Sequence, residues 1–297
     1  MDSYSRLLEY CQLCPRECGV NRRAGEKGFC RGGVWPRVGR AGLHYGEEPC
    51  LSGSRGSGVV FFSGCNLRCV FCQNHIISQG LKGRNLSLEE LGDIFIRLQE
   101  KGAHNLNLIT AFAYVPQVLE SLSIARRRGF NLPVVYNTSG YEKVETLKLL
   151  EGQVSVYLPD IKYYRDHPGL RYSSVTDYFR WAGPAVKEMY RQVGPAVFDE
   201  QGIMIRGVII RILLLPGFLE DAREILNWIS RELPEGVWIS LMSQYTPTYQ
   251  AHRFPEICRP VSSEEYELLL EHFLALGLEN AFIQELSSAK KRFIPAF

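Results

Sequence analysis

The chain has 297 residues, of which 45% are hydrophobic and 22% charged, proportions typical of a folded globular protein. Its 34 basic and 32 acidic residues nearly cancel to a net charge of +2, so electrostatics gives no reason to expect a nucleic-acid or membrane partner. No stretch is apolar for long enough to cross a bilayer, and residues 1–17 lack the apolar segment of a signal peptide, so we expect a cytoplasmic protein.

The predicted elements divide the chain into an irregular N-terminal segment, residues 1–57, and a regular part, residues 58–297. Strands are predicted at 59–62, 106–109, 133–136, 154–158, 208–215, 237–242 and 282–285, with a turn at Gly207 before the fifth. Helices are predicted at 87–101, 116–128, 142–150, within 176–193, and at 221–232 and 263–276. Six strand–helix units in series predict an α/β fold, a partial (β/α)6 TIM-type barrel, with an irregular cysteine-containing N-terminal segment.

The nine cysteines are grouped along the chain. Thiols stay reduced in the cytoplasm, so such groups indicate metal binding or catalysis rather than disulfides. The groups are Cys11, Cys14, Cys18 and Cys30; then Cys65, Cys69 and Cys72; while Cys50 and Cys258 stand apart. We interpret the two isolated cysteines as small apolar residues.

The second group lies in the loop GCNLRCVFCQN, residues 64–74, directly after the first strand. Thiolates are soft ligands that suit an iron–sulfur cluster or zinc. Three thiolates on a four-iron cluster leave one iron open, and the amino and carboxylate groups of S-adenosylmethionine are suited to bind it. The alternative is a zinc site in which His75 is the fourth ligand.

This loop resembles the signature of the radical SAM superfamily, Cys-x3-Cys-x2-Cys, with Phe71 as the aromatic residue before the last cysteine. The longer run PCLSGSRGSGVVFFSGCNLRCVFCQNHIIS resembles the proteins related to pyruvate formate-lyase activating enzyme, in particular the branch with a cysteine-bearing N-terminus. The resemblance implies that Cys65, Cys69 and Cys72 hold a [4Fe–4S] cluster. The reduced cluster then cleaves S-adenosylmethionine to a 5′-deoxyadenosyl radical that abstracts hydrogen from a substrate.

The resemblance also implies partners. A flavodoxin or ferredoxin is the expected electron donor. The substrate is either a protein on which the enzyme installs a glycyl radical, as an activase does, or a small molecule or peptide that it modifies directly. Shared fold is weak evidence for a substrate.

Polar residues that follow the predicted strands are candidates for binding the cofactor. Asp160 and Lys162 match the Asp-x-Lys of the activating-enzyme family, and the alternative for them is a solvated ion pair at a strand end. The full set of cofactor-binding candidates is Phe71, Thr110, Asn137, Thr138, Ser139, Asp160, Lys162, Arg211 and Leu213. For Asn137, Thr138 and Ser139 the alternative is turn chemistry, and for Leu213 it is core packing.

The chain departs from its relatives at two strands. Ile109, Thr110 and Ala111 stand where many superfamily members have Gly-Gly-Glu, and Ile212 stands where the branch commonly has a histidine. These changes indicate a different set of substrate contacts. The candidate substrate-binding residues are His44, in a loop expected to cover the barrel, and Gln244 and Tyr245, after the sixth strand. Loop packing is the alternative for the last two.

The four N-terminal cysteines form a complete set of ligands. Cys11, Cys14, Cys18 and Cys30 have glycines and a proline between them, and the segment has little apolar material with which to fold alone. A bound metal supplies folding energy to such segments. Zinc and a second iron–sulfur cluster both suit four thiolates, and the alternative is a disulfide or a vestigial site without metal. The alternatives for the whole chain are an iron–sulfur electron-transfer protein and a zinc-stabilised interaction protein.

Overall fold

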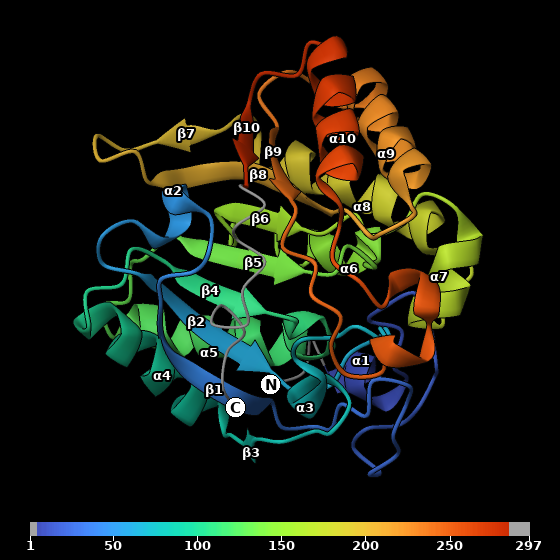
Figure 1. Ribbon diagram of the computed structural model, residues 1–297. Coiled ribbons are helices and arrows are strands. Elements are labelled where there is room, and N and C mark those ends of the chain that lie inside the picture. Colours follow the sequence, from blue (N-terminus) through green and yellow to red (C-terminus); the bar gives the residue numbers. More distant parts are fainter. Residues whose placement is uncertain (1–4, 285–297) are drawn as a thin grey trace.

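The computed structural model describes residues 5–284, which form one curved sheet with helices on its outer side (Figure 1). Seven parallel strands lie side by side in chain order: β2 (Ser57–Phe62), β4 (Leu106–Ile109), β5 (Val134–Thr138), β6 (Val156–Pro159), β8 (Met204–Leu213), β9 (Trp238–Met242) and β10 (Ala281–Ile283). Helices connect each of these strands to the next. The predicted partial TIM-type barrel is confirmed, with six strand–helix units followed by the short strand β10.

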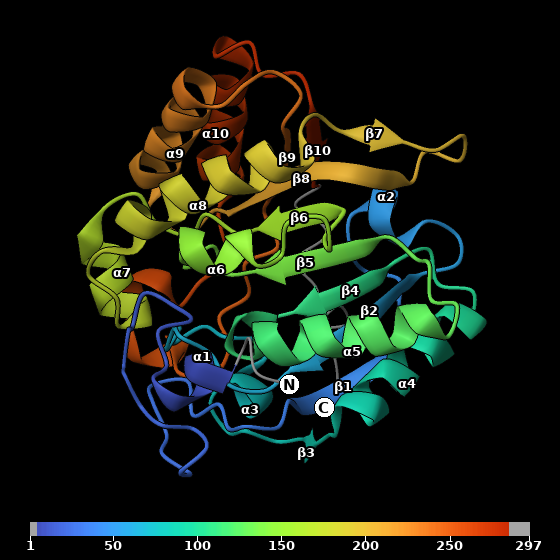
Figure 2. The ribbon, with the colours of Figure 1, turned by 180° about the vertical axis from the view of Figure 1, so that it is seen from behind.

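The helices protect the outer face of the sheet from water (Figure 2). They are α4 (Leu88–Glu100), α5 (Val115–Arg127), α6 (Val144–Lys148), α7 (Asp166–Ser173), α8 (Tyr178–Val193), α9 (Leu219–Glu232) and α10 (Ser263–Ala275). The apolar side chains of these helices and of the strands form the main core. Among residues 5–284, no helix is long and apolar enough to span a membrane.

Two of the predicted helices begin with side-chain hydrogen bonds that cap their first turn. The Ser87 hydroxyl accepts a hydrogen bond from the backbone N–H of Glu90, whose carboxylate accepts one from the Ser87 N–H, so the pair forms a capping box before α4. Ser262 and Glu265 make the same box before α10. These local patterns determine where the helices begin without help from the rest of the fold.

The N-terminal segment contributes a strand that the sequence did not predict. β1 (Arg37–His44) pairs antiparallel with β2, and β3 (Arg84–Asn85) pairs antiparallel with β1. Before β1, helix α1 (Ser5–Glu9) is followed by irregular chain at 10–36. Short helices α2 (Pro49–Ser52) and α3 (His75–Ser78) flank β2. Residues 37–44 therefore belong to the barrel sheet, although their sequence shows little alternation.

Three other predictions need correction. Gly207 makes no turn; β8 passes through it at φ 139°, and a β-carbon there would lie 2.8 Å from the Cα of Ala196. Helix α7 was not predicted, because its Pro168 and Gly169 are poor helix formers, yet Pro168 lies in the first turn where no N–H is needed. Helix α6 is shorter than predicted because Glu142 turns into the core instead of joining it.

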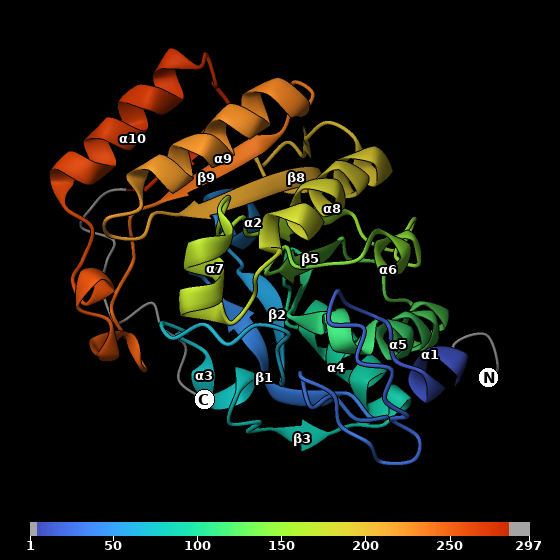
Figure 3. The same ribbon diagram turned by 90° about the vertical axis from the view of Figure 1, so that its right-hand side faces the viewer.

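The two ends of the barrel carry different segments. Figure 3 looks onto the carboxyl ends of the parallel strands, where α3, α7 and the N-terminal loop gather. Helix α2 lies at the opposite end, as Figures 1 and 2 both show. The loop after β2 carries Cys65, so the cysteines lie at the carboxyl end, where barrel enzymes place their active sites.

Candidate functional site

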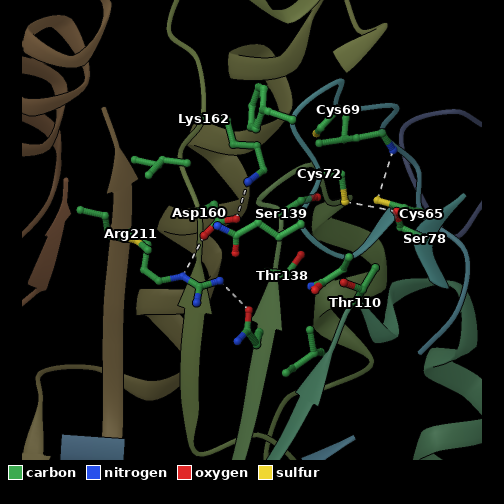
Figure 4. A pocket seen from close by; sticks show the side chains of 18 of the residues that line it. Cys65, Cys69, Cys72, Ser78, Thr110, Thr138, Ser139, Asp160, Lys162 and Arg211 are labelled. Carbon is green, nitrogen blue, oxygen red and sulfur yellow. Dashed lines mark hydrogen bonds and ion pairs between the residues drawn. The ribbon is translucent and has the colours of Figure 1, made fainter. Parts of the chain in front are cut away.

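One cavity of about 260 Å³ runs into the barrel from the carboxyl ends of its strands. Its lining includes Cys65, Cys69 and Cys72 together with every residue that the sequence nominated for cofactor or substrate binding: His44, Phe71, Thr110, Asn137, Thr138, Ser139, Asp160, Lys162, Arg211, Leu213, Gln244 and Tyr245. Figure 4 shows the three cysteine sulfurs on one side of this cavity and the charged side chains on the other. The structure thus brings the predicted residues together.

Neighbouring polar groups orient the three thiols of the loop at residues 64–74, which we call the cluster loop. The Ser173 hydroxyl lies 3.0 Å from the Cys69 sulfur, and the Ser78 hydroxyl lies 3.3 Å from the Cys72 sulfur. The backbone N–H of Leu67 donates to the Cys65 sulfur at 3.4 Å. Hydrogen bonds of this kind stabilise thiolate sulfur and tune a bound cluster.

The bare thiols carry protons at neutral pH. Burial raises the pKa of Cys65 to about 12 and that of Cys72 to about 11, and the neighbouring Cys69 adds to both shifts. Three adjacent soft donors that are costly to ionise alone fit a cationic metal cluster, which stabilises the thiolates when it displaces their protons. The donor chemistry therefore agrees with an iron–sulfur cluster at this loop.

A row of charged residues crosses the cavity opposite the thiols. The Lys162 Nζ lies 2.6 Å from Asp160 Oδ2, and Arg211 Nε lies 2.8 Å from Asp160 Oδ1. Arg211 Nη2 also donates to Asn137 Oδ1 at 2.7 Å. Asp160 and Arg211 meet because the ends of β6 and β8 are neighbours, linked there by an isolated bridge. A buried arginine needs an anionic partner, and Asp160 is that partner for Arg211.

These neighbours keep the whole row ionised. Burial tends to raise the pKa of Asp160, but the Arg211 and Lys162 cations outweigh it and hold that pKa below its usual value. Burial tends to lower the pKa of Lys162, yet Asp160 raises it above its ordinary value. Cys69 also raises the Lys162 pKa, so the Lys162 ammonium group lies within electrostatic range of the cluster loop.

Glu47 extends the row toward the other end of the barrel, and the sequence analysis missed it. Its Oε2 lies 3.6 Å from Arg211 Nη1, and only 8% of its side chain is exposed. Burial raises the pKa of Glu47 to about 7, although Arg211 opposes the shift. Glu47 precedes α2, in a loop whose sequence looked like a cover, and no local pattern marks it as inward-facing.

His44 lies elsewhere than predicted. It is the last residue of β1 and pairs with Ser57, the first residue of β2, so it lines the cavity from the end opposite the cluster loop. The expectation of a loop over the mouth is wrong at this residue, because the antiparallel pairing of β1 directs the chain away from the cysteines. Burial lowers the pKa of His44, and Arg40 lowers it further.

A tight turn after β5 places three more candidates. Gly140 has φ 76°, and a β-carbon there would lie 2.2 Å from the carbonyl oxygen of Asp160, so only glycine allows this approach. The Thr138 hydroxyl donates to the buried carboxylate of Glu142. Burial raises the pKa of Glu142 to about 8, so this carboxyl stays largely protonated at neutral pH. Turn chemistry and cavity lining therefore coexist here.

The remaining candidates are held by packing. Thr110 adopts a left-handed backbone, φ 62°, which is uncommon for a β-branched residue and clusters at functional sites. The rings of Phe71 and Tyr245 pack edge to face, with centroids 5.7 Å apart. The Tyr245 hydroxyl donates to the Ile257 carbonyl at 2.9 Å, so this residue presents its ring to the cavity.

The four N-terminal thiols lie outside the cavity, and two of them, Cys11 and Cys30, contact a buried arginine. Arg22 Nη2 lies 2.9 Å from the Cys11 sulfur and 3.8 Å from the Cys30 sulfur. Cys14 is buried as well, and Cys18 is exposed. Burial raises the pKa of Cys14, and the nearby Cys30 and Cys11 add to the effect. Within residues 5–284, no group of three or more Cys, His, Asp or Glu side chains, the cluster loop included, is arranged around one metal ion.

The two cysteine groups are in contact through the backbone. A β-carbon at Gly64 would lie 2.5 Å from the carbonyl oxygen of Cys30, so the residue before Cys65 touches Cys30 directly. Arg68 donates to the Cys65 carbonyl at 2.8 Å and to the Phe29 carbonyl. This contact joins residues far apart in the chain, and no sequence pattern predicts it.

Comparisons with known proteins agree with this geometry. The family model of the radical SAM superfamily matches residues 59–229, which run from β2 to α9. The uncharacterized protein MJ0674 of Methanocaldococcus jannaschii is 34% identical over 273 residues, which cover 89% of this chain and 74% of that protein. The first four cysteines lie outside the family match, which begins at residue 59.

Two solved structures resemble the fold. A mutant of spore photoproduct lyase aligns with a TM-score of 0.53 at 13% identity, over 82% of this chain and 79% of the lyase. Methylornithine synthase, PylB, aligns with a TM-score of 0.51 at 17% identity, over 74% of this chain and 60% of the synthase. At such identities the likeness concerns the fold alone.

Proposed function

The chain belongs to the radical SAM superfamily, and from that premise we propose that Cys65, Cys69 and Cys72 hold its [4Fe–4S] cluster and that the barrel cavity binds S-adenosylmethionine beside it. The observation that carries the proposal is the shared lining: three thiols and a fixed row of charged side chains face one cavity. When bound, the reduced cluster supplies one electron that splits S-adenosylmethionine into methionine and a 5′-deoxyadenosyl radical.

The charged row supplies complementary groups for the cofactor. Lys162 lines the same cavity as Cys69 and is placed to meet a carboxylate, while Asp160 is placed to accept from an ammonium or from ribose hydroxyls. Arg211 holds the second oxygen of Asp160 and thereby fixes its orientation. Asn137, Thr138 and Ser139 offer further polar contacts around the same cavity.

The row also forms one wall of the proposed reaction site. Arg211 pairs with both Asp160 and Glu47, so these three side chains are held in place relative to one another. Leu213 and Phe71 add apolar groups to the lining of the same cavity, where they are placed to contact the adenine of S-adenosylmethionine.

Two classes of substrate remain as alternatives in the proposal: a glycine of a partner enzyme, as for an activase, and a small molecule or peptide. Gln244 lies on the cavity wall after β9 and is our candidate contact for either class. Deuterium transfer separates the alternatives. A partner protein labelled at its glycines delivers deuterium to 5′-deoxyadenosine only in the activase case.

We further propose that Cys11, Cys14, Cys18 and Cys30 bind a second metal centre, either zinc or an iron–sulfur cluster. Cys11, Cys14 and Cys30 are buried, and burial raises the pKa of Cys11 and of Cys14, so a metal that displaces their protons stabilises the thiolates. Iron, sulfide and zinc are measured on a variant in which Cys65, Cys69 and Cys72 are replaced by alanine. Retained metal supports the second centre, and a metal-free product removes it.

Anaerobic turnover tests the main proposal. Reconstituted protein with a full cluster, reduced with dithionite, is expected to convert S-adenosylmethionine to 5′-deoxyadenosine and methionine, quantified by chromatography. No 5′-deoxyadenosine from protein with four irons bound at the loop would sink the proposed activity.

A further inference from the structure

The outer side of the cluster loop forms a shallow cavity that is distinct from the barrel cavity. Three of its lining residues hydrogen-bond the carbonyls of the three cluster cysteines. Arg68 donates to Cys65 O at 2.8 Å, Gln79 Nε2 donates to Cys69 O at 3.3 Å, and His75 Nδ1 lies 3.2 Å from Cys72 O. A partner seated in this cavity is therefore separated from the cluster ligands by a single layer of side chains.

Basic residues dominate the lining of this cavity and of its neighbour on the N-terminal loop. The two cavities share Arg31, and neither contains an aspartate or glutamate in its lining. We call this surface the basic face; its charged residues at the surface are Arg23, Lys27, Arg31, Arg37, Arg68 and Lys82, while Arg22 is buried beneath it. Two acids lie at its rim: Glu9, 3.7 Å from Arg23, and the exposed Glu26, which precedes Lys27 in the chain. Figure 3 shows the elements that carry the face, α3 and the N-terminal loop, on one side of the molecule.

The cations of this surface lie close together. Arg31, Arg68 and Lys82 line the same shallow cavity, and Arg31 also lines its neighbour together with Lys27 and Arg37. In a chain whose net charge is only +2, a concentration of positive charge beside the cluster is a local feature rather than a property of the whole protein. Such a patch attracts an acidic partner and speeds its encounter.

The composition of the basic face suits a protein partner. Trp35 is 51% exposed and Ile76 is 39% exposed, and the rings of His75 and Tyr249 stack with centroids 4.4 Å apart. Arginine, tryptophan and tyrosine are the residues enriched at protein interfaces. Apolar and aromatic groups among the arginines therefore favour a protein over a phosphate polymer, which binds mainly through charge.

We propose that the basic face docks an acidic one-electron carrier protein, and that electrons enter the cluster through the outer side of its loop. The inference rests on the proposed function, since it presumes a cluster at Cys65, Cys69 and Cys72. In each transfer the carrier is oxidised by one electron and the cluster is reduced by one electron. A flavodoxin in its hydroquinone form would leave as the semiquinone.

The test uses a purified acidic flavodoxin and the reconstituted holoenzyme. Lys27 and Arg31 are both exposed on the basic face, and the double variant Lys27→Glu/Arg31→Glu changes the charge by four. The matched control is Arg126→Glu/Arg127→Glu, which makes the same change at the end of α5, where the chain returns to the start of β5. Binding is measured by thermophoresis with oxidised flavodoxin, and electron transfer by stopped-flow absorbance of the hydroquinone.

We expect the Lys27/Arg31 variant to bind flavodoxin about tenfold or more weakly and to oxidise its hydroquinone more slowly by a similar factor. The control is expected to stay within about twofold of wild type. Wild-type binding should also weaken as salt rises, a readout that needs no variant. Dithionite-driven cleavage of S-adenosylmethionine needs no docking and serves as the reference for each variant.

Equal binding and equal transfer rates in the two double variants would overturn the docking site, as would wild-type binding that does not respond to salt. A duplex or transfer RNA that displaces flavodoxin and binds more tightly would overturn the choice of a protein partner. Failure of wild-type cleavage with dithionite would instead count against the proposed function, because it leaves the binding measurements unaffected.

Discussion

The two groups of cysteines touch through Gly64 and Cys30, yet their surroundings differ. Cys65, Cys69 and Cys72 line a cavity that also holds complementary charged side chains, so a ligand has room beside them. The N-terminal thiols have a guanidinium among them, and Arg22 is only 2% exposed. The difference teaches that the spacing of cysteines identifies a metal-binding group, while its surroundings decide whether the group is open to a substrate.

The largest expected effect comes from Cys65, Cys69 and Cys72, the group that lines the cavity. Cys69→Ala removes one of the three proposed cluster ligands, so cleavage of S-adenosylmethionine should fall to background and loop-bound iron should be lost. Cys258→Ala is the control, because Cys258 is an exposed cysteine outside both groups. Turnover is measured as 5′-deoxyadenosine and metal as iron per chain. Full activity of Cys69→Ala would break the distinction between the groups.

A smaller loss is expected when the charged row is interrupted. Asp160→Asn leaves the partly buried Arg211 and Lys162 without their shared carboxylate. We expect cleavage to slow by roughly 10²-fold and the free energy of unfolding to fall by about 2–3 kcal/mol. Asp93→Asn, at an exposed ion pair with Arg128, should change either quantity little. A variant as active as wild type would show that the row is only structural.

Glu142 lies close enough to the N-terminal group to raise the pKa of Cys14, and its own protonation makes stability depend on pH. Its pKa is raised by burial to about 8, above the ordinary value of 4.5, so the folded state keeps a proton that the unfolded state releases. Stability should therefore fall as pH rises from about 4.5 to about 8. Glu142→Gln keeps a neutral side chain, and we expect it to be more stable than wild type by about 2–3 kcal/mol at pH 9 and similar at pH 5.

Denaturant unfolding at both pH values measures this difference. Glu145→Gln is the matched control, because Glu145 is three residues after Glu142 and lies in the first turn of α6. Parallel pH profiles for wild type and Glu142→Gln would contradict the buried, protonated carboxyl.

The smallest expected effect concerns the N-terminal group of cysteines. Arg22 donates to the Ala113 carbonyl and to the sulfurs of Cys11 and Cys30, so Arg22→Gln leaves buried acceptors without a partner. We expect a loss of about 1–2 kcal/mol in stability, with faster proteolysis within residues 10–36. Its neighbour in sequence, Arg23, is 55% exposed at its side chain, and Arg23→Gln should have little effect. Equal protease resistance in the two variants would mean that Arg22 does not organise the thiols.

The sequence was sufficient where local patterns determine structure. The helices predicted at 87–101 and 263–276 begin at the capping boxes of Ser87 and Ser262, and the apolar pattern located the seven parallel strands. Because parallel strands end at one edge, the polar residues after them were also correctly placed around one cavity. The superfamily was predicted from the loop at 64–74 and is confirmed.

Long-range contacts could not be predicted in this way. Glu47 reaches Arg211 across the barrel, and β1 exists because β2 offers it an edge. Arg68 joins Cys65 to Phe29, and nothing in the sequence near either residue indicates it. Such contacts depend on how distant segments pack, which neither residue spacing nor hydrophobic period reports.

Electron paramagnetic resonance of the reduced, reconstituted protein tests the central claim most directly. If Cys65, Cys69 and Cys72 leave one iron open to the cavity, adding S-adenosylmethionine should change the spectrum of the reduced cluster. The same addition should leave the spectrum of any iron in a Cys65, Cys69 and Cys72 triple-alanine variant unchanged. Identical wild-type spectra with and without S-adenosylmethionine would contradict the account.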